Sequence, residues 1–429
     1  MSYIRPQVEL LEQRLQEDVN FIFLLAGPRQ VGKTTIVRSI VSPSSRQGYY
    51  VSVDDEPAAD PFANSLMEMV APLQVIPQQK NAEWLIHHWS QARRFAEKWQ
   101  ETKQQHASAE FNSRHFVLVV DEIQKIEQWS SIVKGLWDAD RDSRLPMHVV
   151  LLGSAPLLMQ KGFSESLAGR YEVIPVNHWS YPEINQAFGL VPEEYIYYGG
   201  YPGSIRLVAD NRRWRAYVQN SLVKPNVEKD ILQMARIKHP QLLKQLFELG
   251  CHYSGQELSF TKMIEAIYLA KHTETLADYL HLLAEAKLLA GLYKYAGQEV
   301  RKRNSAPKLM VFNTALMTVN QDYSFEEAQA DRSYWGRLVE SCVGAHLLNS
   351  IDEETRLYYW REGGFEVDFV LEKGRRLTAI EVKSGSRPVV ARGLAKFVEK
   401  YPHARPIVVG QGEITLVDFL SQPAAAWLE

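Results

Sequence analysis

A glycine-rich turn near the start of the chain has residues of the types and spacing that bind phosphate. Its pattern is G-x-x-x-x-G-K-T, and the residues expected at the anion are Gly27, Gln30, Val31, Gly32, Lys33, Thr34 and Thr35. A strand-length apolar run, 21–26, precedes the turn, and a helical pattern with Ile36, Val37 and Ile40 follows it. In this setting backbone N–H groups and a helix N-terminus face nucleotide phosphates. The sequence therefore predicts a nucleoside triphosphate site.

Two side chains of the turn have separate expected roles. Lys33 reaches the β- and γ-phosphate oxygens, and the Thr34 hydroxyl suits Mg²⁺. The expected cofactors are therefore ATP and Mg²⁺. The alternative is a chance glycine turn with a lysine, but such a turn does not require the strand before it and the helix after it.

A second apolar strand ends in two acids. Residues 116–120 are apolar without alternation, as in parallel strands covered on both faces, and Asp121 and Glu122 follow. We expect Asp121 to hold Mg²⁺ through water, and Glu122 to orient or deprotonate the attacking water. A strand that ends in Asp-Glu is common by itself. Its place after a phosphate-binding turn makes the prediction specific.

Two further residues follow the next apolar strand, 148–152. Ser154 can touch the γ-phosphate or the attacking water, and it suits a helix N-cap before Pro156 equally well. Arg170 is a candidate arginine finger, because a cation stabilises the charge on a transferring phosphoryl group. The alternative for Arg170 is an ordinary surface arginine. A finger that acts across a subunit contact would make the chain a homo-oligomer.

The long segment 58–113 contains one clear helical stripe, which predicts a helix packed on the sheet. Its apolar members are Leu85, Trp89, Ala92, Ala96 and Trp99. The adjacent His87 and His88 have no partner ligands at useful spacing and are expected to be exposed rather than metal-binding.

The composition is that of a soluble globular protein with two or three domains. The chain has 429 residues, 45% of them hydrophobic and 23% charged, and a net charge of −3. No apolar run approaches the ~20 residues of a membrane span, so no membrane partner is expected. Cys251 and Cys342 lie in apolar helical patterns and are expected to be buried thiols in the cytoplasm.

The last part of the chain carries a second constellation. Strands are predicted at 365–371 and 377–383, so a hairpin brings Asp368 close to Glu381, and Glu381 and Lys383 share a strand face. Two carboxylates suit Mg²⁺ or Mn²⁺, which lowers the pKa of a bound water while Lys383 positions that water.

The spacing of these residues is similar to the PD-(D/E)XK nuclease signature: an Asp, twelve residues, then Glu-x-Lys. Glu340 looks like the acidic residue that the preceding helix contributes as a further metal ligand in that fold. The alternative is a strand whose Glu-Val-Lys face is ordinary surface.

Five motifs in order resemble the prokaryotic AAA-type ATPases that carry a C-terminal domain of unknown function. They are the phosphate-binding turn, Asp121-Glu122-Ile123-Gln124-Lys125, Leu152-Gly153-Ser154, Ser166-Leu167-Ala168-Gly169-Arg170 and Tyr198-Gly199-Gly200-Tyr201-Pro202. The resemblance implies an ASCE-type parallel sheet, a sensor role for Ser154 and a finger role for Arg170. This chain departs from the family in the long segment 58–113, and in Asn313, where the family more often has Asp.

The middle of the chain has the outline of a winged helix, and the resemblance implies the same. Helices are predicted at 260–269 and 273–286, and a hairpin with the basic tip 301–303 follows. If this part contacts DNA, the second helix enters the major groove and the basic tip contacts phosphates. Residues 191–310 hold 17 basic and 12 acidic side chains, a weak pointer to an anionic partner. The alternative is a domain that only packs on the ATPase domain.

The sequence thus predicts an α/β chain of three domains. These are a P-loop parallel-sheet ATPase domain (1–190), a helical and winged-helix domain (191–310) and an α/β restriction-endonuclease-like domain (311–429). The preferred function is an Mg²⁺-dependent ATPase coupled to a nuclease-like domain that acts on DNA, which the Asp368, Glu381 and Lys383 set favours. The rival is an ATP-driven switch that binds nucleic acid or protein without cutting, which the 17 acidic against 13 basic residues of 311–429 favour. A kinase or GTPase is disfavoured, because their further motifs are absent from the sequence.

Overall fold

The computed structural model forms two compact units, Met1–Val176 and Asn177–Glu429. The residues that it describes are 3–41, 48–54, 79–105, 115–153, 166–227, 237–267, 270, 272–297, 305–385, 391–410 and 414–429. The sequence-based boundary at residue 310 falls inside strand β7 (Lys308–Val311). A division of the second unit into two domains stays a prediction.

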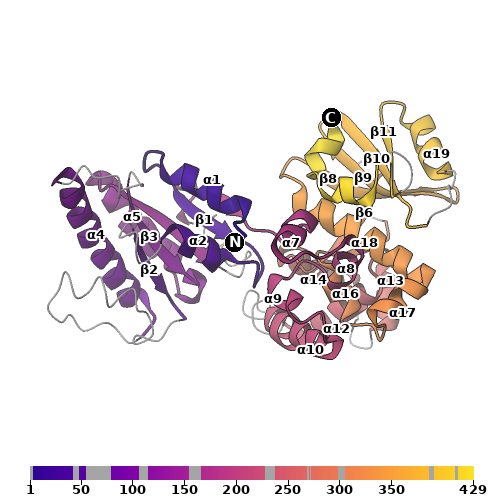
Figure 1. The fold of residues 1–429 in the computed structure, drawn as a ribbon, viewed down its shortest axis with the longest axis horizontal. Helices are drawn as coiled ribbons and strands as arrows, with labels where there is room; N and C mark the ends of the chain where they lie inside the picture. The colour runs from indigo at the N-terminus through magenta and orange to yellow at the C-terminus, as the bar shows by residue number, and fades with distance from the viewer. Residues whose placement is uncertain are drawn as a thin grey trace. The chain divides into compact units, whose positions relative to one another are not determined.

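The first unit is built on a parallel sheet, as the sequence predicted, and this sheet has five strands (Figure 1). Its strands are β1 (Ile22–Ala26), β2 (Gly48–Ser52), β3 (Phe116–Asp121), β4 (Met147–Gly153) and β5 (Tyr171–Pro175). The strand order is β2-β3-β4-β1-β5. Strand β4 therefore separates β1, which leads into the glycine-rich turn, from β3, which ends at the acids.

Helices cover both faces of this sheet. Helices α1 (Pro6–Leu15) and α2 (Lys33–Ile40) pack on the face that contains Phe23 and Leu25. Helices α4 (Ala82–Gln105) and α5 (Trp129–Asp142) pack on the opposite face, with Ile22 and Leu24. Because successive strand residues point to opposite faces and both faces are covered, the strands read as continuous apolar runs.

Helix α4 buries the predicted stripe, and it buries one histidine as well. His88 is 6% exposed, and its Nδ1 lies 2.6 Å from the Tyr49 hydroxyl. The prediction of an exposed pair was wrong for His88, because this residue is three positions after Leu85 and four before Ala92, on the stripe itself. Burial lowers the His88 pKa to about 3, so the ring is neutral at pH 7.

The second unit begins with helices and short turns. They are α7 (Tyr181–Phe188), α8 (Pro192–Tyr198), α9 (Pro202–Ile205), α10 (Asn211–Tyr217), the π-helical segment Val218–Val223, α12 (Pro240–His252), α13 (Phe260–Ala266), α14 (Thr273–Glu285), α16 (Thr314–Thr318), α17 (Phe325–Ala330) and α18 (Arg332–Ser350). Cys251 and Cys342 are free and buried, as predicted. None of the helices in the described ranges has both the length and the apolar character needed to cross a bilayer.

A six-stranded mixed sheet forms the rest of the second unit (Figure 1). Its strands are β6 (Leu289–Lys294), β7, β8 (Arg356–Glu362), β9 (Phe365–Lys373), β10 (Arg376–Val382) and β11 (Arg405–Val409), in the order β11-β10-β9-β8-β6-β7. Helix α18 packs on one face, together with α20 (Leu416–Leu420) and the 3₁₀ helix Ala424–Leu428, and α19 (Arg392–Lys400) packs on the other.

The hairpin predicted as a wing forms, but it extends this sheet. Strands β6 and β7 pair antiparallel, and β6 then pairs parallel with β8 through Tyr293 and Tyr358. The basic tip 301–303 lies outside the described residues. A winged helix in this part of the chain therefore stays a prediction.

Asn313, where the resembled family more often has Asp, ties two parts of the second unit together. Its Oδ1 accepts from the N–H of Gly200 and of Ala315, at 3.2 and 3.1 Å, so it caps α16 and holds the Tyr-Gly-Gly-Tyr-Pro turn. Its Nδ2 lies 3.3 Å from His178 Nδ1. A carboxylate could accept from the two N–H groups but could not donate to the histidine, so the amide suits this position.

Candidate nucleotide site and C-terminal cleft

The glycine-rich turn joins β1 to α2 in a conformation that suits an anion. Gln30 and Gly32 have positive φ angles of 58° and 94°, so the backbone reverses within three residues. A Cβ on Gly27 would lie 1.9 Å from the Val176 carbonyl oxygen, which excludes any side chain there. Val31 is buried within the turn, whereas Thr35 is exposed in the first turn of α2.

The Lys33 side chain lies inside this turn. Its ammonium donates to the carbonyl oxygens of Gly27 and Pro28 at 2.8 and 2.7 Å, and the residue is 7% exposed. The cation is therefore already held where phosphate oxygens are expected. A bound triphosphate would offer it stronger, charged acceptors than these carbonyls.

Arg5, just before α1, supports the turn from outside the motif. Its Nη1 donates to the Val31 carbonyl oxygen at 2.8 Å, and the residue is 5% exposed. Sequence reasoning did not find this residue, because nothing in its spacing relates it to the motif. The contact fixes the outer side of the turn to the residue before α1.

The Asp121 carboxylate accepts hydrogen bonds from the first turn of α2, from β2 and from the residue that follows β3. Its Oδ2 accepts from the Thr34 and Tyr50 hydroxyls at 2.8 and 2.7 Å, and its Oδ1 accepts from the Glu122 N–H at 2.9 Å. Tyr50, on β2, was not predicted to take part. An Asp oxygen and a Thr hydroxyl side by side are a ligand pair that suits Mg²⁺, which commonly binds one or two protein oxygens plus substrate phosphates.

Glu122 follows with a strained backbone. Its φ is 56°, in the left-handed region that non-glycine residues avoid. Gln124 donates to its carboxylate at 2.6 Å, and the Lys125 ammonium lies 3.7 Å from the same oxygen. Such strain tends to be kept where a side chain must point in one direction.

Arg170 forms a forked ion pair within its own unit. Its Nε and Nη2 donate to the two carboxylate oxygens of Asp138, on α5, at 2.8 and 3.1 Å. Hydrogen bonding to Arg170 lowers the Asp138 pKa below its usual range. The pair holds the guanidinium on this unit's surface, so the finger role stays a prediction, and Ser154 lies outside the described residues.

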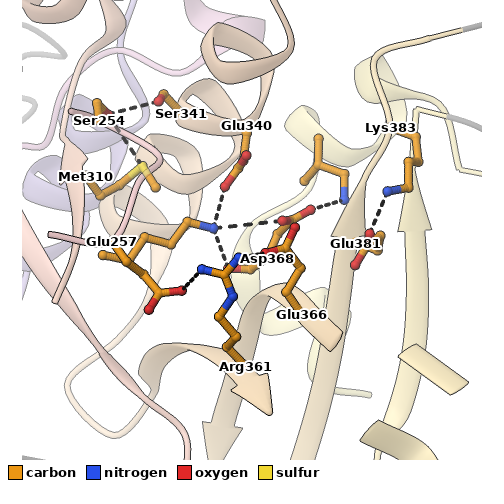
Figure 2. Close-up of polar contacts among 12 residues, drawn as sticks. Ser254, Glu257, Met310, Glu340, Ser341, Arg361, Glu366, Asp368, Glu381 and Lys383 are labelled. Atoms are coloured by element: carbon orange, nitrogen blue, oxygen red, sulfur yellow. Dashed lines mark hydrogen bonds and ion pairs between the residues drawn. The ribbon is translucent and has the colours of Figure 1, made fainter. Parts of the chain in front are cut away.

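In the second unit the predicted hairpin β9–β10 places the acidic residues on neighbouring strands. Asp368 Oδ2 accepts from the Val382 N–H at 2.7 Å, and Lys383 donates to Glu381 Oε1 at 2.6 Å (Figure 2). Glu381 is 7% exposed, and its Oε2 has no hydrogen-bond partner within the described part of the chain. Burial, and then the nearby Asp368 charge, raise the Glu381 pKa, which the pairing with Lys383 opposes.

Lys308, on β7, is the residue of this region that sequence reasoning missed. Its ammonium forms an ion pair with Glu340, on α18, and lies 3.9 Å from Asp368 Oδ1. It also donates to the Asp368 carbonyl oxygen at 3.1 Å. Burial by itself would lower the Lys308 pKa, but the charges of Glu340 and Asp368 outweigh burial and raise it.

A cleft of about 320 Å³ opens beside Lys308. Its charged lining consists of Glu257, Glu340, Glu366, Asp368, Lys308 and Arg361, which is four acids against two cations. Arg361 pairs with Glu257 at 2.9 Å and with Glu366 at 3.0 Å. The cleft is therefore net acidic and does not favour a bare phosphodiester.

The metal expected at the second constellation does not fit the residues as they lie. Across the described ranges, no three His, Cys, Asp or Glu side chains are grouped to hold a metal ion. Glu340 and Asp368 share the Lys308 ammonium, and Glu381 pairs with Lys383. The three predicted metal ligands are thus divided between two lysines and do not form one ligand set.

Family comparison agrees with the geometry of the first unit. A family described as "AAA domain" matches residues 19–185. This part of the chain is therefore similar to AAA domains. Two families described as domains of unknown function, DUF8612 and DUF4143, match residues 192–323 and 335–418.

The chain is also similar to two uncharacterized proteins, one of Mycobacterium bovis and one of Mycobacterium tuberculosis. Each is 24% identical over 305 residues, which are 69% of this chain and 65% of the relative. The match thus spans less than two thirds of the length of these relatives.

Among solved structures, the chain is similar to a Walker-type ATPase of Pyrococcus abyssi, with a TM-score of 0.46, 14% identity and coverage of 75% of this chain and 98% of that one. It is similar to the Aeropyrum pernix ORC1 protein, solved in complex with DNA, with a TM-score of 0.29, 13% identity and coverage of 78% and 95%. The AMPPCP-bound DnaA of Aquifex aeolicus gives a TM-score of 0.30 at 13% identity, covering 66% of this chain and 86% of that one.

Proposed function

We propose that the AAA-type domain binds ATP with Mg²⁺ and hydrolyses it. The observation that carries this proposal is the 2.8 Å hydrogen bond from the Thr34 hydroxyl to Asp121. Thr34 lies in the helix that follows β1 and Asp121 ends β3, two strands that β4 separates, yet the two side chains are in contact. A glycine turn without a nucleotide site would not require Thr34 and Asp121 to be in contact.

Each residue has a distinct part in the proposed reaction. Backbone N–H groups of the turn and the Lys33 ammonium bind the phosphates, and Thr34 and Asp121 hold the metal ion. Mg²⁺ supplies charge that stabilises the transferring phosphoryl group. Glu122 orients the attacking water and accepts its proton, since its left-handed backbone fixes the direction of its side chain. Arg170 is the proposed finger.

For the second unit we propose the non-cutting alternative, a module that binds nucleic acid or protein under control of the ATPase. The element order α18-β8-β9-β10-α19-β11 supports the resemblance to a nuclease-like fold. The positions of Lys308 and Lys383, each paired with a carboxylate expected to bind metal, favour binding without cutting. DNA stays a candidate partner, because residues 191–310 are net basic.

One experiment tests both parts of the proposal. The intact chain is incubated with ATP, Mg²⁺ or Mn²⁺ and varied DNA and RNA, while phosphate release and strand cutting are followed together. Lys33→Ala is expected to abolish ATP binding, and Glu122→Gln is expected to keep binding and lose hydrolysis. Glu127→Gln, an exposed carboxylate five residues later, is the matched control and is expected to hydrolyse ATP normally.

Two results would contradict the proposal. Hydrolysis by Glu122→Gln at the rate of the unmutated protein would remove the role given to Glu122. If the unmutated protein cuts strands and Lys383→Ala does not, the non-cutting role is wrong and the nuclease predicted from the sequence is supported.

A further inference from the structure

Lys308 is a buried lysine held by three separate elements of the second unit. Its Cα belongs to β7, its ion-pair partner Glu340 to α18, and Asp368 to β9. The Lys308 side chain is only 8% exposed. A lysine is rarely buried unless its charge is balanced, so its position is set by the groups around the ammonium.

The ammonium uses its donors on acidic and electron-rich groups. It contacts the Glu340 carboxylate, the Asp368 carbonyl oxygen at 3.1 Å and the Asp368 carboxylate at 3.9 Å, and it lies 4.9 Å from the centre of the Phe369 ring. A lysine ammonium is a compact positive charge with three N–H donors. Two carboxylates and a main-chain carbonyl are also the oxygen ligands that a hard divalent cation takes.

We infer that Lys308 is a built-in cation that takes the place of a divalent metal between Glu340 and Asp368. This inference deepens the non-cutting role proposed for this part of the chain and rests on that role. A metal ion that entered here would have to displace a buried ammonium from its charged partners. Removing one partner of a buried ion pair leaves an uncompensated charge, which opposes that displacement.

The exchange of a metal for a lysine changes what the cleft can do. A divalent cation acidifies a bound water and stabilises charge on a phosphate, whereas an ammonium gives a fixed single charge and activates no water. Because Lys308 is part of the polypeptide, its positive charge is present at every metal concentration. It joins the hairpin β6–β7 to α18 and β9, the two elements that carry the acids.

The inference is tested by titrating Mn²⁺ into the intact chain by calorimetry. Every protein in the series carries Asp121→Asn, so that the AAA-type domain does not contribute a metal site. The Lys308-containing protein is expected to bind no Mn²⁺ in the second unit. Lys308→Met is expected to gain one Mn²⁺ site per chain, and adding Asp368→Asn is expected to abolish it. Lys308→Arg keeps a cation and is expected to gain none.

Lys373→Met is the matched control. Lys373 also lies between two carboxylates, 2.5 Å from Asp352 and 3.2 Å from Glu354, but its side chain is 32% exposed. Water can solvate those carboxylates when the lysine is lost, so no Mn²⁺ site is expected there.

Two outcomes overturn the inference. One is that the Lys308-containing protein binds Mn²⁺ and that Asp368→Asn abolishes this binding. This comparison does not depend on whether a Lys308 variant folds. The other is a folded Lys308→Met protein that gains no Mn²⁺ site. Because these readouts measure binding, they are independent of the strand-cutting assay that tests the non-cutting role.

Discussion

The Tyr50 hydroxyl is expected to determine how well the nucleotide site holds Mg²⁺. It donates to Asp121 Oδ2 at 2.7 Å, and the Thr34 hydroxyl donates to the same oxygen at 2.8 Å. If Thr34 turns to the metal ion when Mg²⁺·ATP binds, Tyr50 keeps its hydrogen bond and holds the carboxylate in place. The change that tests this is Tyr50→Phe.

The magnitude follows from the kind of hydrogen bond that is lost. Tyr50 is 3% exposed, and the Arg38 guanidinium lies 4.8 Å from its ring centre, a contact that Phe retains. A hydrogen bond to a charged group contributes about 1.5–3 kcal/mol. Because this bond is present before and after Mg²⁺ binds, only the part of it that orients the carboxylate affects the metal. A loss of about 1.4 kcal/mol corresponds to a tenfold rise in the Mg²⁺ concentration for half-maximal hydrolysis, which is the shift expected for Tyr50→Phe.

The assay is phosphate release at saturating ATP over a Mg²⁺ titration, and Tyr49→Phe is the control. Tyr49 is the preceding residue on β2, equally buried, and its hydroxyl pairs with His88 at 2.6 Å on the opposite face of the sheet. Its loss should leave the Mg²⁺ midpoint unchanged. An unshifted midpoint in folded Tyr50→Phe would refute the reasoning, and so would an equal shift in Tyr49→Phe.

Two other predictions concern Arg170 and acid stability. Arg170→Ala should slow hydrolysis and leave ATP affinity nearly unchanged, because an arginine finger acts on the transition state. Unchanged turnover would mean that Arg170 only forms its ion pair with Asp138 and takes no part in hydrolysis. Burial lowers the His148 pKa to about 4. Below pH 6.5 the unfolded chain therefore binds a proton at this residue that the folded chain does not bind. The free energy of unfolding decreases as the pH falls from 6.5 towards 4. Between pH 7 and pH 5 this costs about 2 kcal/mol, and His148→Gln should lose less stability over that interval in denaturant unfolding. Equal losses in both proteins would contradict the assignment to His148.

The candidate nucleotide site could be located in the sequence because its signals are local. The turn needs a small set of residue types at fixed spacing, and strands covered on both faces are apolar throughout, so Lys33 and Asp121 stand out in the sequence. Tyr50 could not be found in this way. Alternation along β2 puts Tyr49 and Tyr50 on opposite faces, but only the completed sheet shows which of them meets Asp121.

The C-terminal cleft shows the same limit more strongly. The hairpin β9–β10 was predicted from its turn and its apolar partners, and with it the nearness of Asp368 to Glu381. Lys308 is distant from both of its acidic partners in the sequence, and the pattern around it reads as an ordinary edge strand. Its role depends on strand pairing between β6 and β8, a long-range contact with no local signal.

That pairing also decides which pieces of this chain can be studied by themselves. A fragment that begins at residue 311 would lose β6 and most of β7, and would present the open edge of β8 to other chains. It would also lose the Lys308 ammonium and leave Glu340 without its ion-pair partner. Such a truncated protein would aggregate more readily, and it would bind metal only because Lys308 had been removed. A fragment for separate study should therefore begin at Asn177, where the second compact unit begins.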